Sequence, residues 1–157
     1  MDMAGTAASA AAHADPAALI RKWFDEVWNK GRAESIDELF PDHAVMWGVG
    51  RPETPSQGTA EFKKFYHALR SAFPDVHVTL EKVVHEGDTA FARWTASMTH
   101  TGDGLGMAPT NRKLKIWGMS ALRVRDGEIV EGWNSWDQIG LARQLGVLEG
   151  HAAELFA

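Results

Sequence analysis

Asp137 is the first candidate for a catalytic residue, because it is a single carboxylate that follows large apolar side chains. A strand over this stretch would point alternate residues to one face, and these are Ile129, Glu131, Trp133, Ser135 and Asp137. A carboxylate among tryptophan rings loses hydration, and such groups serve as general acids or bases near neutral pH. The alternative is structural: the same aspartate could cap a helix that begins directly after it.

His100 is the second catalytic candidate. It ends a predicted strand beside a loop over residues 102–111 that contains three glycines. From that position an imidazole could donate to a developing enolate or return a proton to it. The alternative is a histidine at a strand end in partial contact with solvent.

Bulk composition is that of an ordinary globular chain of 157 residues, which predicts one domain. The net charge is −5 and the basic residues do not cluster, so nucleic acid and membrane surfaces are not expected partners. No apolar run approaches the length of a membrane span. The chain has no cysteine, which excludes disulfides and cysteine metal sites and fits a cytoplasmic location.

Tryptophan is unusually abundant, with seven residues against one tyrosine. Its large flat ring can form the wall of a pocket for a small hydrophobic ligand. The alternative for each ring is plain core packing. The apolar residues that we predict to contact a ligand are Trp23, Trp28, Trp47, Trp94, Trp117, Met119 and Trp133.

Periodicity predicts helices first and strands afterwards. Helical spacing covers residues 16–30, 33–40 and 59–73, with a short strand at 43–49. The pattern then changes to period two, and a last helix follows residue 137. The predicted strands cover residues 76–84, 89–101, 112–125 and 128–136. This order predicts an α+β fold, a curved antiparallel sheet with helices on its concave side, as one domain over residues 16–150. We expect a disordered alanine-rich tail over residues 1–15 and a short tail over residues 151–157.

Four segments resemble the SnoaL-like polyketide cyclases, also called ester cyclases, of the nuclear-transport-factor-2-like superfamily. The resemblance spans residues 17–148. The segments are IRKWFDEVWNKGRAESIDELF, FPDVHVTLEKVVHEGDTAFARW, THTGDGLGMAPTNRKLKIWG and, as the most specific, LRVRDGEIVEGWNSWDQIGLARQLG. The loop departs from the family pattern at residues 107–111, where a second proline and a final glycine are usual.

The resemblance implies a cone-shaped domain with an apolar pocket and an intramolecular aldol condensation as its reaction. Asp137 matches the family's acid/base aspartate, no metal or organic cofactor is implied, and a homodimer formed through the sheet is expected. Two other interpretations stay open. The chain could be a non-catalytic ligand-binding or dimerising module. It could also be an epoxide hydrolase of similar fold, although such enzymes use an arginine and two aspartates and this strand reads Arg93-Trp94-Thr95.

Overall fold

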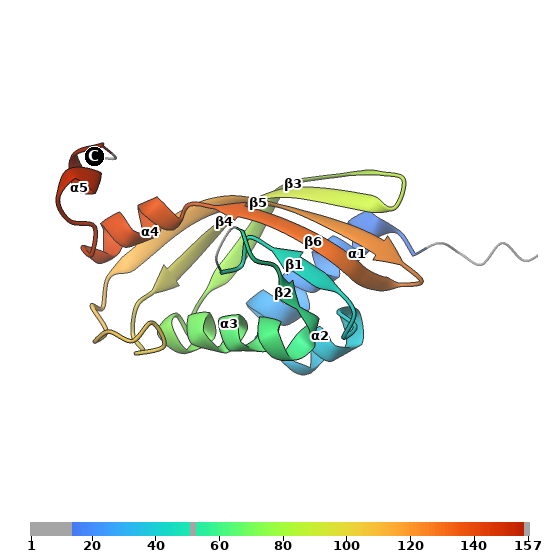
Figure 1. Ribbon diagram of the computed structural model, residues 1–157, viewed down its shortest axis with the longest axis horizontal. Coiled ribbons are helices and arrows are strands. Elements are labelled where there is room, and N and C mark those ends of the chain that lie inside the picture. The colour runs from blue at the N-terminus through green and yellow to red at the C-terminus, as the bar shows by residue number, and fades with distance from the viewer. Residues whose placement is uncertain (1–13, 51–52, 156–157) are drawn as a thin grey trace, which may run out of the picture.

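A curved six-stranded sheet carries helices against its concave face (Figure 1). The computed structural model describes residues 14–50 and 53–155. The helical elements are α1 (Pro16–Lys22), η1 (Trp23–Asn29), α2 (Glu34–Leu39), α3 (Gly58–Ala72), α4 (Gln138–Leu145) and α5 (His151–Leu155). The strands are β1 (Val45–Trp47), β2 (Ser56–Gln57), β3 (His77–Glu86), β4 (Thr89–Thr99), β5 (Lys113–Arg125) and β6 (Glu128–Trp136).

The sheet has the order β2-β1-β6-β5-β4-β3, so the four strands from β3 to β6 form an antiparallel meander. This part of the prediction, and the α+β class with helices on one face, is confirmed. Two features were not predicted: β1 pairs in parallel with β6, and the two-residue strand β2 closes that edge. Both depend on contacts between segments far apart in the sequence.

Burial along β4 and β5 alternates with the predicted period of two. Ala92, Trp94, Ala96 and Met98 are buried on the concave side, and Phe91 on the opposite side is 41% exposed. Because the period of a strand is two, one register assigns every side chain of these strands to a face.

In β6 the predicted face is wrong. Arg123 pairs with Glu131 whereas Val124 pairs with Ile129, so Val130 forms a bulge. An extra residue moves the side chains before it to the other face of the sheet. Ile129 is therefore fully buried, whereas Trp133 on the outer face is 39% exposed.

The predicted first helix changes its geometry part-way. After α1, residues Trp23–Asn29 form a π-helix, and Lys30 N donates to Asp25 O at 2.8 Å across five residues. Residues five apart lie near one another along a π-helix, whereas the 3.6-residue turn of an α-helix would separate them around its axis. Trp23 and Trp28 consequently point toward the same side.

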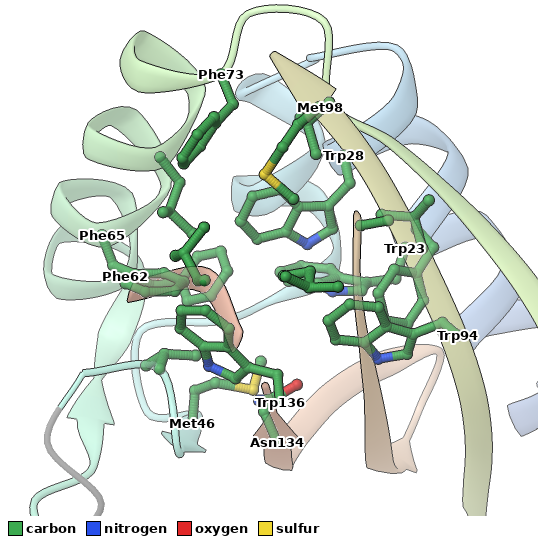
Figure 2. Close-up of a pocket in the computed structure, with 18 residues that line it drawn as sticks. Trp23, Trp28, Met46, Phe62, Phe65, Phe73, Trp94, Met98, Asn134 and Trp136 are labelled. Atoms are coloured by element: carbon green, nitrogen blue, oxygen red, sulfur yellow. The ribbon is translucent and has the colours of Figure 1, made fainter. Parts of the chain in front are cut away.

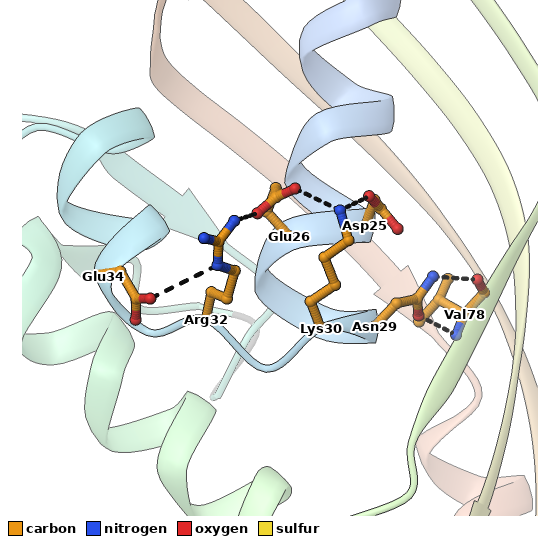
Figure 3. Close-up of polar contacts among 7 residues, drawn as sticks. All are labelled: Asp25, Glu26, Asn29, Lys30, Arg32, Glu34 and Val78. Atoms are coloured by element: carbon orange, nitrogen blue, oxygen red, sulfur yellow. Dashed lines mark hydrogen bonds and ion pairs between the residues drawn. The ribbon is translucent and has the colours of Figure 1, made fainter.

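The π-helix is fastened to the edge strand β3 by Asn29 (Figure 3). The Asn29 Nδ2 donates to Val78 O at 2.9 Å, and the Val78 N donates back to Asn29 Oδ1 at 2.6 Å. The side-chain amide thus occupies an edge position that another strand would otherwise take. The ion pairs beside it, including Lys30 with Glu26 at 2.7 Å, are more exposed and contribute little.

The ends of the chain add one helix that was not predicted. Residues 1–13 of the expected N-terminal tail lie outside the described residues, and Asp15 caps α1 through its bond from Ala17 N at 3.0 Å. The tail predicted over residues 151–157 contains the short helix α5 instead. Among the described residues, no helix has the length and apolar character needed to cross a membrane.

Replacing Asn29 with Asp should release the π-helix from β3, because a carboxylate cannot donate to the Val78 carbonyl. We expect a loss of about 1 to 3 kcal/mol in the free energy of unfolding, measured by urea denaturation. Lys30→Ala is the matched control, since it removes only exposed ion pairs and should cost less than about 1 kcal/mol. Equal losses in the two variants would contradict this function of Asn29.

Candidate functional site

An apolar cavity lies between the concave face of the sheet and the helices (Figure 2). Its volume is about 80 Å³, which is smaller than the roughly 150 Å³ of an apolar cavity that holds benzene, so the closed cavity accommodates only part of a ring-containing ligand. No acidic or basic side chain lines it among the described residues, and Asn134 supplies the one carboxamide. The aromatic lining residues are Trp23, Phe24, Trp28, Phe62, Phe65, Phe73, Trp94 and Trp136.

A chain of hydrogen bonds holds the wall formed by β4, β5 and β6. Trp94 Nε1 donates to Ser120 Oγ at 3.0 Å, and Ser120 Oγ donates to Asn134 Oδ1 at 2.7 Å. Asn134 Nδ2 then donates to Trp47 O at 3.0 Å. These groups satisfy one another, so the network orients Trp94 and Asn134. Most of its donors and acceptors are used within the wall and do not face the cavity.

Asp137 follows the last residue of β6 and is the N-cap of α4, as the structural alternative predicted. Its Oδ1 accepts a hydrogen bond from Gly140 N at 2.8 Å. A Cβ at residue 140 would overlap this carboxylate, so a larger residue there would require the Asp137 side chain to move. Within the described residues Oδ2 has no hydrogen-bond partner. The carboxylate itself does not line the cavity, but Trp136 and Leu141 on either side of it in the sequence do.

His100 is fully buried, so the interpretation of a histidine in partial contact with solvent is wrong. The Thr110 N donates to His100 Nδ1 at 3.1 Å, which leaves the proton of a neutral ring on Nε2. Nε2 has no partner in the described part of the chain. The imidazole packs on Phe73, with ring centroids 5.5 Å apart, and it is Phe73 that lines the cavity.

The predicted ligand-binding residues divide between the two faces of the sheet. Trp23, Trp28 and Trp94 line the cavity. The other four do not, and three of them are large exposed residues of the outer face: Trp117 (52% exposed), Met119 (37%) and Trp133 (39%). Trp47 pairs with Trp133 in the parallel register and shares that face. Their assignment to the pocket is corrected because tryptophan content alone does not reveal the side of a sheet.

Several lining residues were not assigned to the site from the sequence. Phe62, Phe65 and Phe73 lie at helical spacing within the predicted helix 59–73, but an apolar stripe that faces a cavity looks the same in the sequence as one that faces solid core. Trp136 has its N–H bonded to Gly48 O at 3.1 Å and occupies the cavity wall beside Asp137. The bulge in β6 placed it there, and no local pattern indicated that bulge.

Comparison with known proteins agrees with this architecture. The sequence matches the family model of the SnoaL-like polyketide cyclases over residues 18–145. The chain belongs to the SnoaL-like polyketide cyclase family. This confirms the resemblance and the fold expected from it. No curated protein matches the sequence.

Solved structures of similar fold include IdmH from Streptomyces antibioticus, described as a candidate polyketide cyclase. It is 31% identical, with a TM-score of 0.72, and the match covers 85% of this chain and 99% of IdmH. AclR from Streptomyces galilaeus, described as a candidate hydroxylase, is 25% identical with a TM-score of 0.74 over 84% and 96% of the two chains. The SnoaL-like fold therefore carries more than one assigned chemistry.

Behind the cavity wall of this SnoaL-like protein, Glu131 connects β1, β5 and β6 on the outer face. It accepts from Arg123 Nη2 at 2.6 Å and from Trp47 Nε1 at 3.2 Å. The hydrogen bond from Arg123 is the largest influence on the pKa of Glu131 and lowers it; partial burial opposes this shift and the Trp47 bond adds to it. Glu131 thus helps hold the strand whose Trp47 carbonyl anchors Asn134.

Replacing Glu131 with Gln should lower the free energy of unfolding by up to about 1 kcal/mol at pH 7. Because its pKa is lower in the folded state, the stabilisation by Glu131 is complete above the unfolded value of about 4.3. It is lost as the pH falls through the lower folded value. Urea denaturation from pH 7 to 3 should therefore show the wild type approaching the variant in stability.

Glu128→Gln on the same strand is the control, since Glu128 makes no ion pair or side-chain hydrogen bond with the described residues. It should leave the free energy of unfolding at pH 7 nearly unchanged. A difference between wild type and Glu131→Gln that stays constant down to pH 3 would contradict the coupling.

Proposed function

We propose that the cavity binds a small hydrophobic carbonyl compound, such as a polyketide ester, and that Asp137 transfers a proton in its ring closure or isomerisation. The observation that carries this proposal is the position of a half-buried carboxylate between two cavity-lining residues, Trp136 and Leu141. Its Oδ1 is used in capping, but Oδ2 has no partner among the described residues. A carboxylate oxygen of that kind is available to accept a proton.

In an aldol ring closure, Asp137 would remove a proton from the carbon next to a carbonyl, which leaves an enolate. The enolate carbon attacks a second carbonyl carbon of the same molecule and forms the new carbon–carbon bond. The resulting alkoxide is protonated, and Asp137 can return the proton that it took. A rigid apolar cavity favours this reaction by holding the two reacting carbons together. The steps require no metal or organic cofactor.

His100 enters the proposal as a second proton donor through its Nε2–H. Because its ring packs behind Phe73, the phenyl ring must move before the imidazole can reach a ligand. We therefore give the principal role to Asp137.

A second candidate is a non-catalytic module that binds a hydrophobic ligand. The specific observation in its favour is that the Asp137 carboxylate bonds the backbone of α4 and does not line the cavity. Such a protein would bind the same class of ligand and leave it unchanged.

Asp137→Asn separates capping from catalysis, because asparagine caps a helix about as well as aspartate but is a poor base. We expect unchanged thermal stability and a turnover of polyketide esters that falls by about a hundredfold to ten-thousandfold. Turnover should be followed by mass spectrometry of the products across a panel of linear esters and ketones.

The control is Asp137→Ala, which removes the base and the cap and should also lose about 1 kcal/mol of stability. Equal turnover by wild type and the Asn variant would eliminate Asp137 as the base. Binding without any turnover by the wild type would favour the second candidate.

We also propose that two copies of the chain associate through the outer face of the sheet. Across neighbouring strands, Phe91 lies opposite Ala121, and Ala121 lies opposite Trp133. Together with exposed Trp117 and Met119, these residues make an apolar patch, a feature typical of protein interfaces. A second copy would cover it with the same side chains, as a two-fold interface requires.

Trp117→Lys should weaken such a dimer by about tenfold or more, because it places an unpaired charge in an apolar interface. Light scattering across a concentration series would measure the change in molar mass. Ala60→Lys on the exposed side of α3 is the control and should leave the dimer intact. A wild-type monomer at micromolar concentration would rule the proposal out.

A further inference from the structure

Two tryptophans that line the cavity have indole N–H groups without an acceptor. Neither Trp23 nor Trp28 donates a side-chain hydrogen bond within the described residues, although Trp23 is only 3% exposed. The other two lining tryptophans are satisfied: Trp94 donates to Ser120 at 3.0 Å and Trp136 to the Gly48 carbonyl at 3.1 Å. A buried tryptophan N–H normally finds a partner, so Trp23 needs an explanation, and the half-buried Trp28 beside it likewise has no acceptor within the described residues.

The two unpartnered groups share one part of the cavity. Both rings pack on Phe62, with centroid distances of 5.2 Å for Trp23 and 6.4 Å for Trp28. Figure 2 shows both indoles on the same side of the cavity, opposite Phe65. The π-helix is responsible, because it places residues five apart on the same side.

These nitrogens are also reachable. In the described part of the chain, two side-chain polar atoms are fully buried and lack a hydrogen-bond partner: Ser56 Oγ and His100 Nε2. Trp23 Nε1 and Trp28 Nε1 are not among them. Because both side chains line the cavity, we infer that a molecule inside it can reach these donors.

We propose that the indole N–H groups of Trp23 and Trp28 bind the carbonyl oxygen of the ligand. A neutral donor pair in an apolar cavity suits an uncharged acceptor, because no lining cation would compensate a buried carboxylate. As negative charge develops on that oxygen in an enolate, the same two donors stabilise it more strongly. The assignment rests on the proposed hydrophobic carbonyl ligand, but it requires neither Asp137 nor turnover.

Nuclear magnetic resonance of wild-type protein labelled with ¹⁵N provides the direct test. Acetophenone and α-methylstyrene are the probes, because they have nearly the same shape but acetophenone has a carbonyl oxygen where α-methylstyrene has a CH₂ group. Acetophenone should move the indole N–H protons of Trp23 and Trp28 downfield, and α-methylstyrene should not. The N–H signals of Trp94 and Trp136 should keep their bonded positions with both probes. Single Trp→Phe variants assign the signals.

Dissociation constants for both probes in three variants provide the second measurement. Trp23→Phe and Trp28→Phe should weaken acetophenone binding about tenfold more than they weaken α-methylstyrene binding, because each removes one hydrogen bond to oxygen. Trp94→Phe is the matched control: it also shortens a ring in the cavity wall, but its N–H is already used by Ser120. It should change the two constants by the same factor.

The outcomes separate this inference from the proposed function. The donor pair would be overturned, and the hydrophobic pocket kept, if both probes bind without a downfield shift and each variant weakens the binding of both probes by the same factor. Failure of both probes to bind wild-type protein would overturn the donor pair together with the proposed ligand class. If Asp137→Asn protein lacks turnover but acetophenone still moves the N–H signals of Trp23 and Trp28 downfield, the inference is supported independently of catalysis.

Discussion

Each residue of a strand can face only one side of the sheet, and the rest of this structure depends on that division. On the concave side, the strands are covered by helices that carry large aromatic side chains. The cavity beside Trp94 and Phe62 is what remains. On the outer side, the same strands expose Trp117 and Trp133. One sheet therefore supplies both a candidate ligand site and a candidate interface.

The π-helix connects backbone geometry to the chemistry of the cavity. It turns Trp23 and Trp28 to the same side and is held at the sheet edge by the amide of Asn29. A wider helical turn is less favourable than an α-helix, and such segments persist mostly where a site uses them. Here the result is that Trp23 and Trp28 both line a cavity whose lining carries no charge among the described residues.

Capping and catalysis by Asp137 are compatible in this arrangement. One carboxylate oxygen binds the first turn of α4, which fixes the orientation of the group, and the other oxygen has no partner among the described residues. In the proposed reaction, the cap would already have removed the rotational freedom of this carboxylate before a ligand arrives. The fold of the family alone does not select a reaction, since relatives with this architecture are assigned different chemistries.

The sequence by itself determined most of the helices and strands and the cap at Asp137, because these depend on neighbours a few residues away. The period of two in β4, the aromatic stripe of α3 and the cap at Asp137 were all readable locally. Only the tertiary structure decided the bulge at Val130, the parallel pairing of β1 with β6 and the π-helical turn. It also decided which tryptophans reach the cavity. An apolar side chain has the same local signature in a core, a cavity wall or an interface, and the difference lies in what packs against it from distant parts of the chain.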